Sequence, residues 1–149
     1  MKVTAATRSR ARHYAMQALY QWQMTKKTPE LIEAEFHSDN DMSKVDVEYF
    51  SAAFQGAAND AEKLDEQFAP YLKDKKLQEL DPVTLAVLRL AAFEFGERID
   101  VPYKVVINEA VNLAKKFGAE ESHKFINGVL DKLAKDLRQL EVQQQIQQQ

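Results

Sequence analysis

Apolar residues recur at helical spacing along most of this chain, and four prolines divide the repeats into segments. The first segment shows the pattern most clearly, with residues at i, i+4, i+7 and i+11 that form one stripe on a helix: Ala11, Ala15, Ala18 and Trp22. Helix-favouring residues are frequent, and only four glycines occur in 149 residues. The sequence therefore predicts an all-α fold, and the length suits a single domain with its own core.

Proline and capping signals set the expected boundaries of the other helices. Asp81-Pro82 and Pro102 are helix starts, and Gly118 is a stop. Gly56 is a weak point that could bend or divide the third helix. The expected segments are 8–25, 30–36, 46–68, a helix from Pro82, a helix from Pro102 to Gly118, and 120–140, with a loop at 38–41.

The helix after Pro82 is apolar nearly all round. Such a helix lies at the centre of a core or uses its second face against a partner. The glutamine-rich end of the chain has the opposite character. We therefore expect one helical domain over 1–140 and a disordered tail over 141–149.

Positive charge is concentrated at the start of the chain. Residues 1–29 carry six basic side chains and no acidic ones, whereas residues 30–149 carry 14 basic and 23 acidic side chains, a net charge of −9. Arginines interleaved with Tyr14, Tyr20 and Trp22 suit phosphate contact combined with base stacking. Trp22 lies on the core stripe, but Tyr20 lies off it and is free to stack on a base. A solvated, arginine-rich terminus is the competing interpretation, and these residues do not separate RNA from DNA.

Signals of catalysis are missing from the sequence. It has no cysteine, no nucleotide-binding or hydrolase motif, and no second ligand at metal spacing from His13, His37 or His123. We expect no enzyme activity, no cofactor and no metal. Because no apolar run approaches the ~20 residues of a membrane span and no signal peptide is recognisable, we expect a cytoplasmic protein without membrane contact.

Two stretches near the C-terminus have a specific pattern. Residues 101–118 read VPYKVVINEAVNLAKKFG, and residues 122–131 read SHKFINGVLD. This pair resembles the C-terminal signature of the bacterial transcription antitermination factor family NusB. The segment 8–22, which ends in QALYQW, and the segment 45–50 are similar to the same family.

The resemblance implies a fold of two stacked three-helix subdomains with a connecting helix. It also implies binding to the boxA-type single-stranded RNA of ribosomal RNA leaders, together with the small-subunit ribosomal protein NusE. Through that complex, other Nus factors and RNA polymerase would read through terminators during ribosomal RNA synthesis.

Site residues follow from the same resemblance. The expected RNA-binding residues are Arg8, Arg10, Arg12, Tyr20, Glu121, Lys124 and Phe125. Ser9 stands where a longer arginine run would have another arginine. The expected partner-binding residues are Tyr20, Met24, Val83, Thr84 and Leu85. The last three are chosen because they open the apolar helix after Pro82, which has a face to spare.

Two alternatives compete with this interpretation. The chain could be a protein-interaction module in which the arginines are incidental. Some ribosomal RNA cytosine methyltransferases also carry a NusB-like domain. The sequence has no cofactor-binding domain and no catalytic cysteine, so we expect a free-standing factor.

Overall fold

The apolar helix predicted after Pro82 lies at the centre of the fold. In the computed structural model, which describes residues 2–148, α5 (Pro82–Glu97) packs against α1, α3, α4, α6 and α7. Asp81 caps it by accepting from the Thr84 amide at 2.9 Å, and Pro82 occupies its first turn. The central position explains why this helix is apolar on nearly every side.

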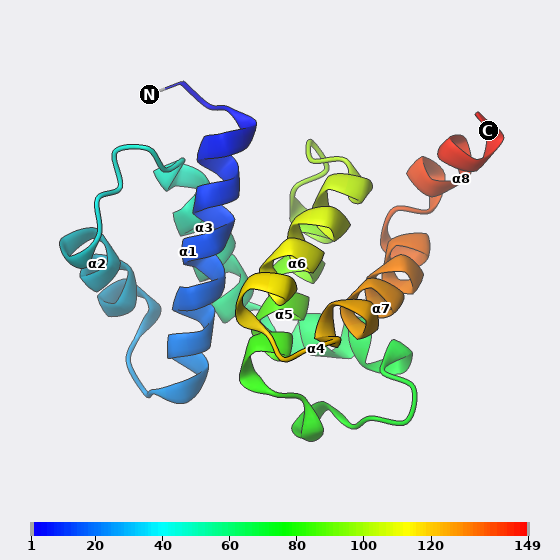
Figure 1. Ribbon diagram of the computed structural model, residues 1–149, viewed down its shortest axis with the longest axis horizontal. Coiled ribbons are helices and arrows are strands. Elements are labelled where there is room, and N and C mark those ends of the chain that lie inside the picture. Colours follow the sequence, from blue (N-terminus) through cyan, green and yellow to red (C-terminus); the bar gives the residue numbers. More distant parts are fainter. Residues whose placement is uncertain (1, 149) are drawn as a thin grey trace.

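The helices form two groups of three, and this confirms the predicted fold class (Figure 1). α1 (Ala5–Met24), α2 (Pro29–Asp39) and α3 (Val47–Asn59) pack on one another, as do α5, α6 (Tyr103–Phe117) and α7 (Ser122–Leu137). The short α4 (Ala61–Phe68) connects the groups and contacts α3, α5 and α7. In the view of Figure 1, α1, α6 and α7 lie in front.

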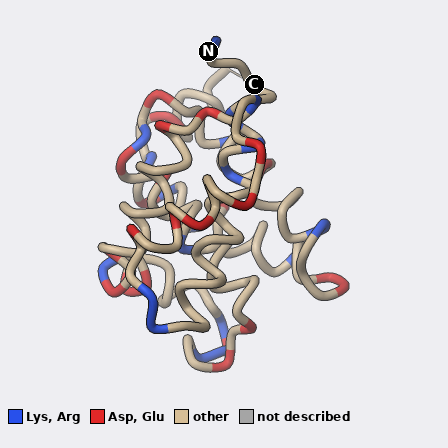
Figure 2. Tube along the Cα trace, turned by 90° about the vertical axis from the view of Figure 1, so that its left-hand side faces the viewer, with Lys and Arg blue, Asp and Glu red and all other residues tan. Residues whose placement is uncertain are grey.

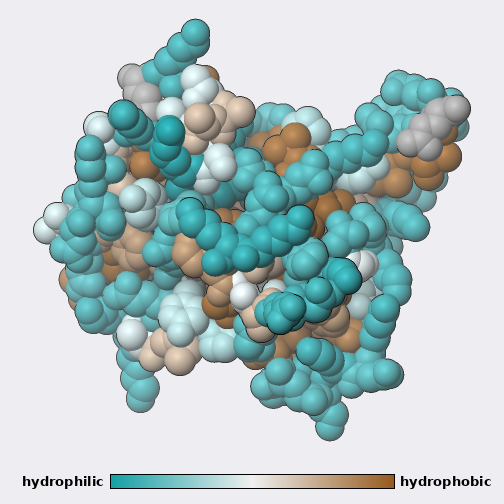
Figure 3. Space-filling model, viewed as in Figure 1, coloured by the Kyte–Doolittle hydropathy of each residue, from teal (hydrophilic) through white to brown (hydrophobic). Residues whose placement is uncertain are grey.

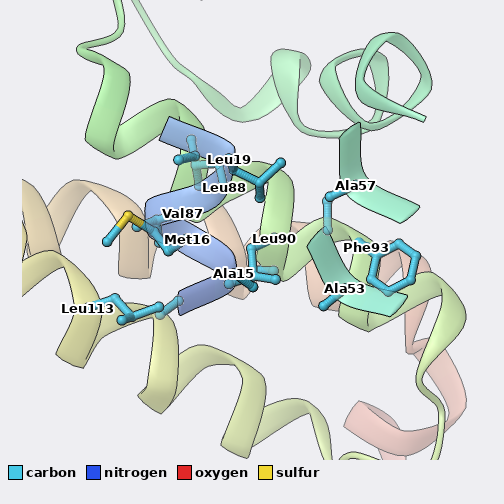
Figure 4. Packing of buried hydrophobic residues seen from close by; sticks show 14 of the residues in the cluster. Ala15, Met16, Leu19, Ala53, Ala57, Val87, Leu88, Leu90, Phe93 and Leu113 are labelled. Carbon is cyan, nitrogen blue, oxygen red and sulfur yellow. The ribbon is translucent and has the colours of Figure 1, made fainter. Parts of the chain in front are cut away.

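The predicted stripe on the first helix forms its buried face. Ala11, Ala15, Ala18 and Leu19 are completely buried, while Trp22 is half-buried. Figure 4 shows Ala15, Met16 and Leu19 of α1 beside Val87, Leu88 and Leu90 of α5. Small alanines on this face let α1 approach its neighbours closely, because close packing depends on the volume of the contacting side chains.

The third predicted helix is divided, but at Asp60 and not at Gly56. Asp60 has φ −103° and ψ 18°, which ends α3 and begins α4. Gly56 lies inside α3, and the ring of Phe93 packs directly on it. A Cβ at this position would lie 2.3 Å from a Phe93 ring carbon. The glycine therefore marks a close approach between α3 and α5 and not a bend.

The loop expected at 38–41 begins later than predicted. α2 continues through Asp39, and the Asn40 side chain donates to the Phe36 carbonyl at 3.0 Å. Between α4 and α5 the chain forms two short 3₁₀ helices, η1 (Ala69–Tyr71) and η2 (Leu77–Glu79). No helix of the described residues has the length and apolar character needed to cross a membrane.

The end of the chain differs from the expectation of disorder, because residues Gln139–Gln147 form α8. Arg138, which is buried, joins α7 to α8 and donates to the carbonyls of Glu94, Phe95, Arg98 and Val101. These carbonyls lie at and beyond the C-terminal end of α5, where a cation is favoured. Glu141 accepts from Arg138 and from the Tyr103 amide at the start of α6. The first turn of α8 is thus fixed to the core despite its glutamine-rich sequence.

Candidate nucleic-acid and partner interface

Arg12 lies in the core and not on the surface where the sequence placed it. Its side chain is 3% exposed, and its Nε donates to an Oε2 of Glu94 at 2.8 Å. The Tyr49 hydroxyl donates to the same carboxylate. Burial raises the pKa of Glu94, although the Arg12 charge and the Tyr49 hydrogen bond act against it. Arg12 therefore binds α1 to α5, and its guanidinium is not available to a phosphate in this conformation.

Arg8 is half-buried and already has carboxylate partners. Its guanidinium lies 3.5 Å from Asp46 and 3.4 Å from Asp100, and it covers the Tyr49 ring at 4.5 Å. Figure 2 shows acidic residues beside basic ones over much of the trace. An RNA phosphate would have to compete with these carboxylates for Arg8.

Arg10 is the exposed arginine of the three, and its guanidinium donates to the Lys44 carbonyl at 3.2 Å. It borders a cleft of about 480 Å³ between α1 and α6. Three cationic side chains line this cleft, Arg10, Lys44 and Lys116, and His13 lies with them. Two carboxylates, Asp41 and Glu109, also line it. We call this site the basic cleft. Its cations come from α1, from the loop before α3 and from the last turn of α6.

His13 joins the basic cleft to the surface beside it. Lys116 Nζ lies 3.5 Å from His13 Nδ1, and the His13 ring packs edge-on against Phe117 at 4.8 Å between centroids. Partial burial, followed by the Lys116 charge, lowers the pKa of His13. The lowered pKa favours the neutral imidazole in the free protein.

A second, more apolar groove of about 450 Å³ lies next to the basic cleft. We call it the apolar groove. Phe117, which packs on His13, lines it. Three of the predicted partner residues, Tyr20, Met24 and Val83, also line it, and Tyr20 and Met24 are exposed. The structure thus brings these three residues together at one site from α1 and α5.

The other two predicted partner residues lie elsewhere. Thr84 is 3% exposed, and its hydroxyl donates to Asp81 at 2.8 Å, so it stabilises the start of α5. Leu85 is half-buried beside Trp22 and Arg89, in a separate hollow. The prediction placed both on the partner face because α5 is apolar all round, a pattern that does not indicate which side of the helix faces solvent.

The predicted RNA-binding residues Glu121, Lys124 and Phe125 lie at the start of α7. Lys124 is exposed and pairs with Glu121 at 2.6 Å, and Phe125 is half-buried. The residue before the helix, Glu121, has a left-handed backbone with φ 71°. Lys75 Nζ lies over the Phe125 ring at 5.1 Å. These three predicted residues therefore lie together, but on different helices from the basic cleft.

Sequence reasoning missed His13, Lys44, Lys75 and Lys116 as candidate site residues. Lys116 lies in the last turn of α6, where the helix dipole alone favours a lysine, so its position does not indicate a binding site. Lys44 and Lys75 lie in loops with mixed charge, so no periodic pattern identifies them. In the described range no group of three or more His, Asp or Glu side chains is placed to hold a metal.

Comparisons with known proteins identify the family. The NusB family model matches residues 9–135. The protein named transcription antitermination protein NusB in Teredinibacter turnerae is 71% identical over 141 residues, covering 95% of this chain and 96% of the relative. The protein with the same name in Saccharophagus degradans is 66% identical over 143 residues, covering 96% and 95%.

Solved structures agree with this result. T. maritima NusB superimposes with a TM-score of 0.77 at 33% identity, covering 91% of this chain and 93% of the other. A chain in a structure described as a plectonemic RNA supercoil gives a TM-score of 0.73 at 27% identity, covering 86% and 94%. The chain therefore belongs to the NusB family of transcription antitermination factors, which are not enzymes.

Proposed function

We propose that this protein binds boxA-type single-stranded RNA of ribosomal RNA leaders together with the ribosomal protein NusE. The complex would then join other Nus factors on RNA polymerase and help it read through terminators. Such work on a nascent transcript would take place in the cytoplasm. The relatives named above carry the function of transcription antitermination in their names, and a similar chain occurs in a structure with RNA.

The observation that carries the proposal is the adjacency of the basic cleft and the apolar groove. His13 lines the basic cleft, Phe117 lines the apolar groove, and the centroids of their rings lie 4.8 Å apart. A cationic cleft attracts phosphates, and a neighbouring apolar surface with exposed Tyr20 and Met24 suits a protein partner. RNA and protein bound side by side would each enlarge the surface offered to the other.

The cations of the cleft act mainly through charge. Arg10, Lys44 and Lys116 are exposed, so they exchange water for phosphate oxygens at little desolvation cost. Asp41 and Glu109 in the same cleft reduce its net charge. Moderate affinity for RNA alone, increased by the partner, is the expected result.

The experiment that tests this function is photochemical crosslinking to boxA-type RNA with residue-level mapping, with and without NusE. We expect crosslinks near Arg10, His13 and Lys116, with stronger labelling when NusE is present. Labelling restricted to the α2 surface or to α8 would contradict the proposal. The control is an RNA of equal length and scrambled sequence, crosslinked to the same protein.

A second candidate function is that of a protein-interaction module without a direct role in RNA binding. The ion pairs of Arg12 with Glu94 and of Arg8 with Asp46 and Asp100 favour it, because these arginines already have partners. On this account the variant R10Q/K116Q would leave RNA recruitment unchanged, while Met24→Glu would abolish partner binding. Our proposal expects the first variant to lose RNA binding.

A further inference from the structure

An open groove lies where α8 leaves the body of the molecule. It has a volume of about 530 Å³, and it is bordered by the C-terminal ends of α5 and α7 and by the first turn of α8. It shares no lining residue with the basic cleft or the apolar groove. Figure 1 shows α8 at the opposite end of the molecule from α2. We call this site the α8 groove; its principal residues are Gly96, Ile99, Asp136, Leu140 and Glu141.

Two apolar side chains of the α8 groove are strongly exposed. Ile99 and Leu140 are each 76% exposed, more than any other large apolar side chain in residues 2–148. Phe95, which is buried, and Leu137, which is half-buried, also line the groove. Figure 3 shows apolar atoms along α8 and on the body beside its base. Exposed apolar residues that are grouped around a hollow indicate an interaction surface, whereas scattered ones do not.

Gly96 in the wall of this groove is a glycine that the fold itself does not require. It lies inside α5, and no glycine in residues 2–148 has positive φ. A Cβ built at Gly96 would meet no atom within 4 Å beyond the backbone of its own helix. Glycine is among the least favourable residues inside a helix, so alanine would suit α5 better here. A bare backbone retained at an open surface suits the close approach of another molecule.

The walls of the α8 groove are fixed before any partner arrives. Arg138, which is buried between α7 and α8, donates to the Phe95 carbonyl at 2.7 Å and to the Val101 carbonyl at 3.0 Å. Glu141 accepts from Arg138 and from the Tyr103 amide, which lies 2.7 Å away. A preformed site binds its partner with little loss of conformational entropy. The geometry therefore favours docking of a partner onto an existing surface.

The charges around the α8 groove are mainly negative. Asp136 and Glu141 line it, and the exposed Glu97 adjoins Gly96. The C-terminal ends of α5 and α7, which carry partial negative charge, also border it. Arg138 lines the groove too, but its buried guanidinium is already engaged by backbone carbonyls and by Glu141. This surface would repel an RNA phosphate or an identical acidic groove, and it would attract a lysine or an arginine.

We propose that the α8 groove binds an apolar segment of a partner protein that carries lysine or arginine beside its apolar residues. The apolar side chains of this segment cover Ile99 and Leu140 and pack over Gly96, while its cations lie near Asp136 and Glu141. A helix with an apolar stripe flanked by basic residues has this chemistry. The inference goes beyond the RNA and NusE contacts proposed above, and the separate position of the groove allows all three sites to be occupied together.

The test uses a fluorescent synthetic peptide of about 16 residues, with leucine at i, i+3, i+4 and i+7 and lysine at the positions beside that stripe. Anisotropy measures its binding to the full chain, and the amide signals of the four glycines in an NMR spectrum help to locate it. We expect saturable binding, a shift of the Gly96 amide signal and weaker affinity at higher salt. Absence of binding would overturn the proposal, and so would an unshifted Gly96 amide.

Two control peptides separate the apolar stripe from the charge. In the first, glutamate replaces every lysine, and in the second the same residues are shuffled so that the stripe is lost. We expect each to bind at least about tenfold more weakly than the test peptide. Equal binding of the glutamate peptide would contradict the charge complementarity of the groove. Equal binding of the shuffled peptide would mean that general attraction to an acidic protein explains the result, and the proposal would fail.

Variants of the exposed apolar residues test the location of the site. The variant I99Q/L140Q removes apolar surface without a change of charge, and we expect it to bind the test peptide about tenfold more weakly. The matched control, L31Q/V47Q, removes exposed apolar side chains from α2 and α3. It should bind the peptide within about twofold of the unchanged protein. Equal affinities of the two double variants would place the peptide outside the α8 groove.

Substitutions of Gly96 test whether the groove must be open. Because a Cβ has room at this position, both Gly96→Ala and Gly96→Trp should fold, and their melting temperatures check this. Alanine should raise the melting temperature and keep the peptide affinity within about threefold. Tryptophan should fill the groove and weaken peptide binding about tenfold. A folded Gly96→Trp variant that binds the peptide like the unchanged protein would contradict the proposal.

Two further measurements distinguish other occupants of the groove. If sedimentation shows a dimer of the unchanged protein that I99Q/L140Q does not form, the groove binds a second copy of the chain and the proposal is overturned. The same variant should bind boxA-type RNA and NusE like the unchanged protein, and loss of either would assign the groove to those contacts instead. Failure of peptide binding with normal RNA and NusE binding would overturn this inference and leave the proposed function standing.

Discussion

The guanidinium of Arg12 donates to the carboxylate of Glu94 at 2.8 Å, with the two side chains 3% and 2% exposed. This pair joins α1, at the beginning of the chain, to the central helix α5. Arg12 also lies 5.2 Å from the centre of the Tyr49 ring and 3.4 Å from Glu109, so α3 and α6 share the contact. One residue of the arginine cluster thus serves to orient the helix that carries the others.

Loss of Arg12 should therefore lower the free energy of unfolding of the protein, in addition to any effect on RNA binding. Arg12→Ala leaves Glu94 buried without its partner, and we expect a loss of about 3–5 kcal/mol in the free energy of unfolding. Urea denaturation measures this directly. The matched control, Arg10→Ala, removes an exposed arginine two residues away and should cost less than about 0.5 kcal/mol. Equal stability of the two variants would contradict the assignment of Arg12 to the core.

RNA affinity should depend on pH through His13. Burial and the nearby Lys116 lower the pKa of His13 in the free protein, whereas a bound phosphate favours the charged form. Binding then takes up a proton, so affinity should rise as the pH falls from about 7.5 to about 5.5. The other charged groups that line the cleft with His13 are Arg10, Lys44, Lys116, Asp41 and Glu109.

The variant His13→Gln isolates this effect. It keeps a polar side chain in the cleft but cannot gain charge, so its affinity should stay nearly constant over the same range. Anisotropy titrations at constant ionic strength provide the measurement. An unchanged pH profile in the variant would mean that another group takes up the proton.

The C-terminal helix should divide into an essential and a dispensable part. Arg138 donates to four backbone carbonyls at and beyond the C-terminal end of α5. In Arg138→Gln the carbonyls of Phe95 and Val101 lose this donor, whereas those of Glu94 and Arg98 still accept from backbone amides. We expect a loss of about 2–4 kcal/mol in the free energy of unfolding. Removal of residues 144–149 should change the melting temperature little, because Gln144, Ile146 and Gln147 are exposed. Differential scanning fluorimetry of both variants would show whether the boundary between the essential and the dispensable part of α8 lies before Gln144.

The apolar groove should bind NusE independently of the basic cleft. Met24 is 58% exposed in the groove. Met24→Glu would place a charge on a surface that loses its water when a partner binds. We expect about a hundredfold loss of NusE affinity, or about 2.7 kcal/mol, with RNA binding alone unchanged. Calorimetric titration measures the first and anisotropy the second. Thr84→Ala is the structural comparison, since it should lower stability but leave NusE affinity of the folded protein unchanged.

Much of this fold follows from the sequence because helix boundaries depend on local chemistry. Asp81, Pro82 and Gly118 act through their own backbone and side chains, and each lies at or next to the predicted helix end. The predicted break at Gly56 was wrong for a non-local reason. The missing side chain at Gly56 leaves room for the ring of Phe93, which is distant in the sequence. The spacing of apolar residues alone does not reveal that contact.

The candidate site was less predictable than the fold. Charge in a sequence identifies Arg8, Arg10 and Arg12 equally, but their exposure depends on carboxylates that lie far along the chain: Asp46, Glu94 and Asp100. Only the folded structure separates the exposed Arg10 from the buried Arg12. The cleft also gathers His13, Lys44 and Lys116 from three segments, which no single stretch of sequence brings together.

The most direct test of the account is the salt dependence of boxA-type RNA binding by the unchanged protein and by R10Q/K116Q, each with NusE present. With three to five phosphate contacts, log K of the unchanged protein should fall with log salt at a slope of about −2 to −3.5. The variant should bind more weakly, with a slope shallower by about 1.4. A flat salt response of the unchanged protein, or identical slopes for the two proteins, would contradict the assignment of the basic cleft to RNA phosphates.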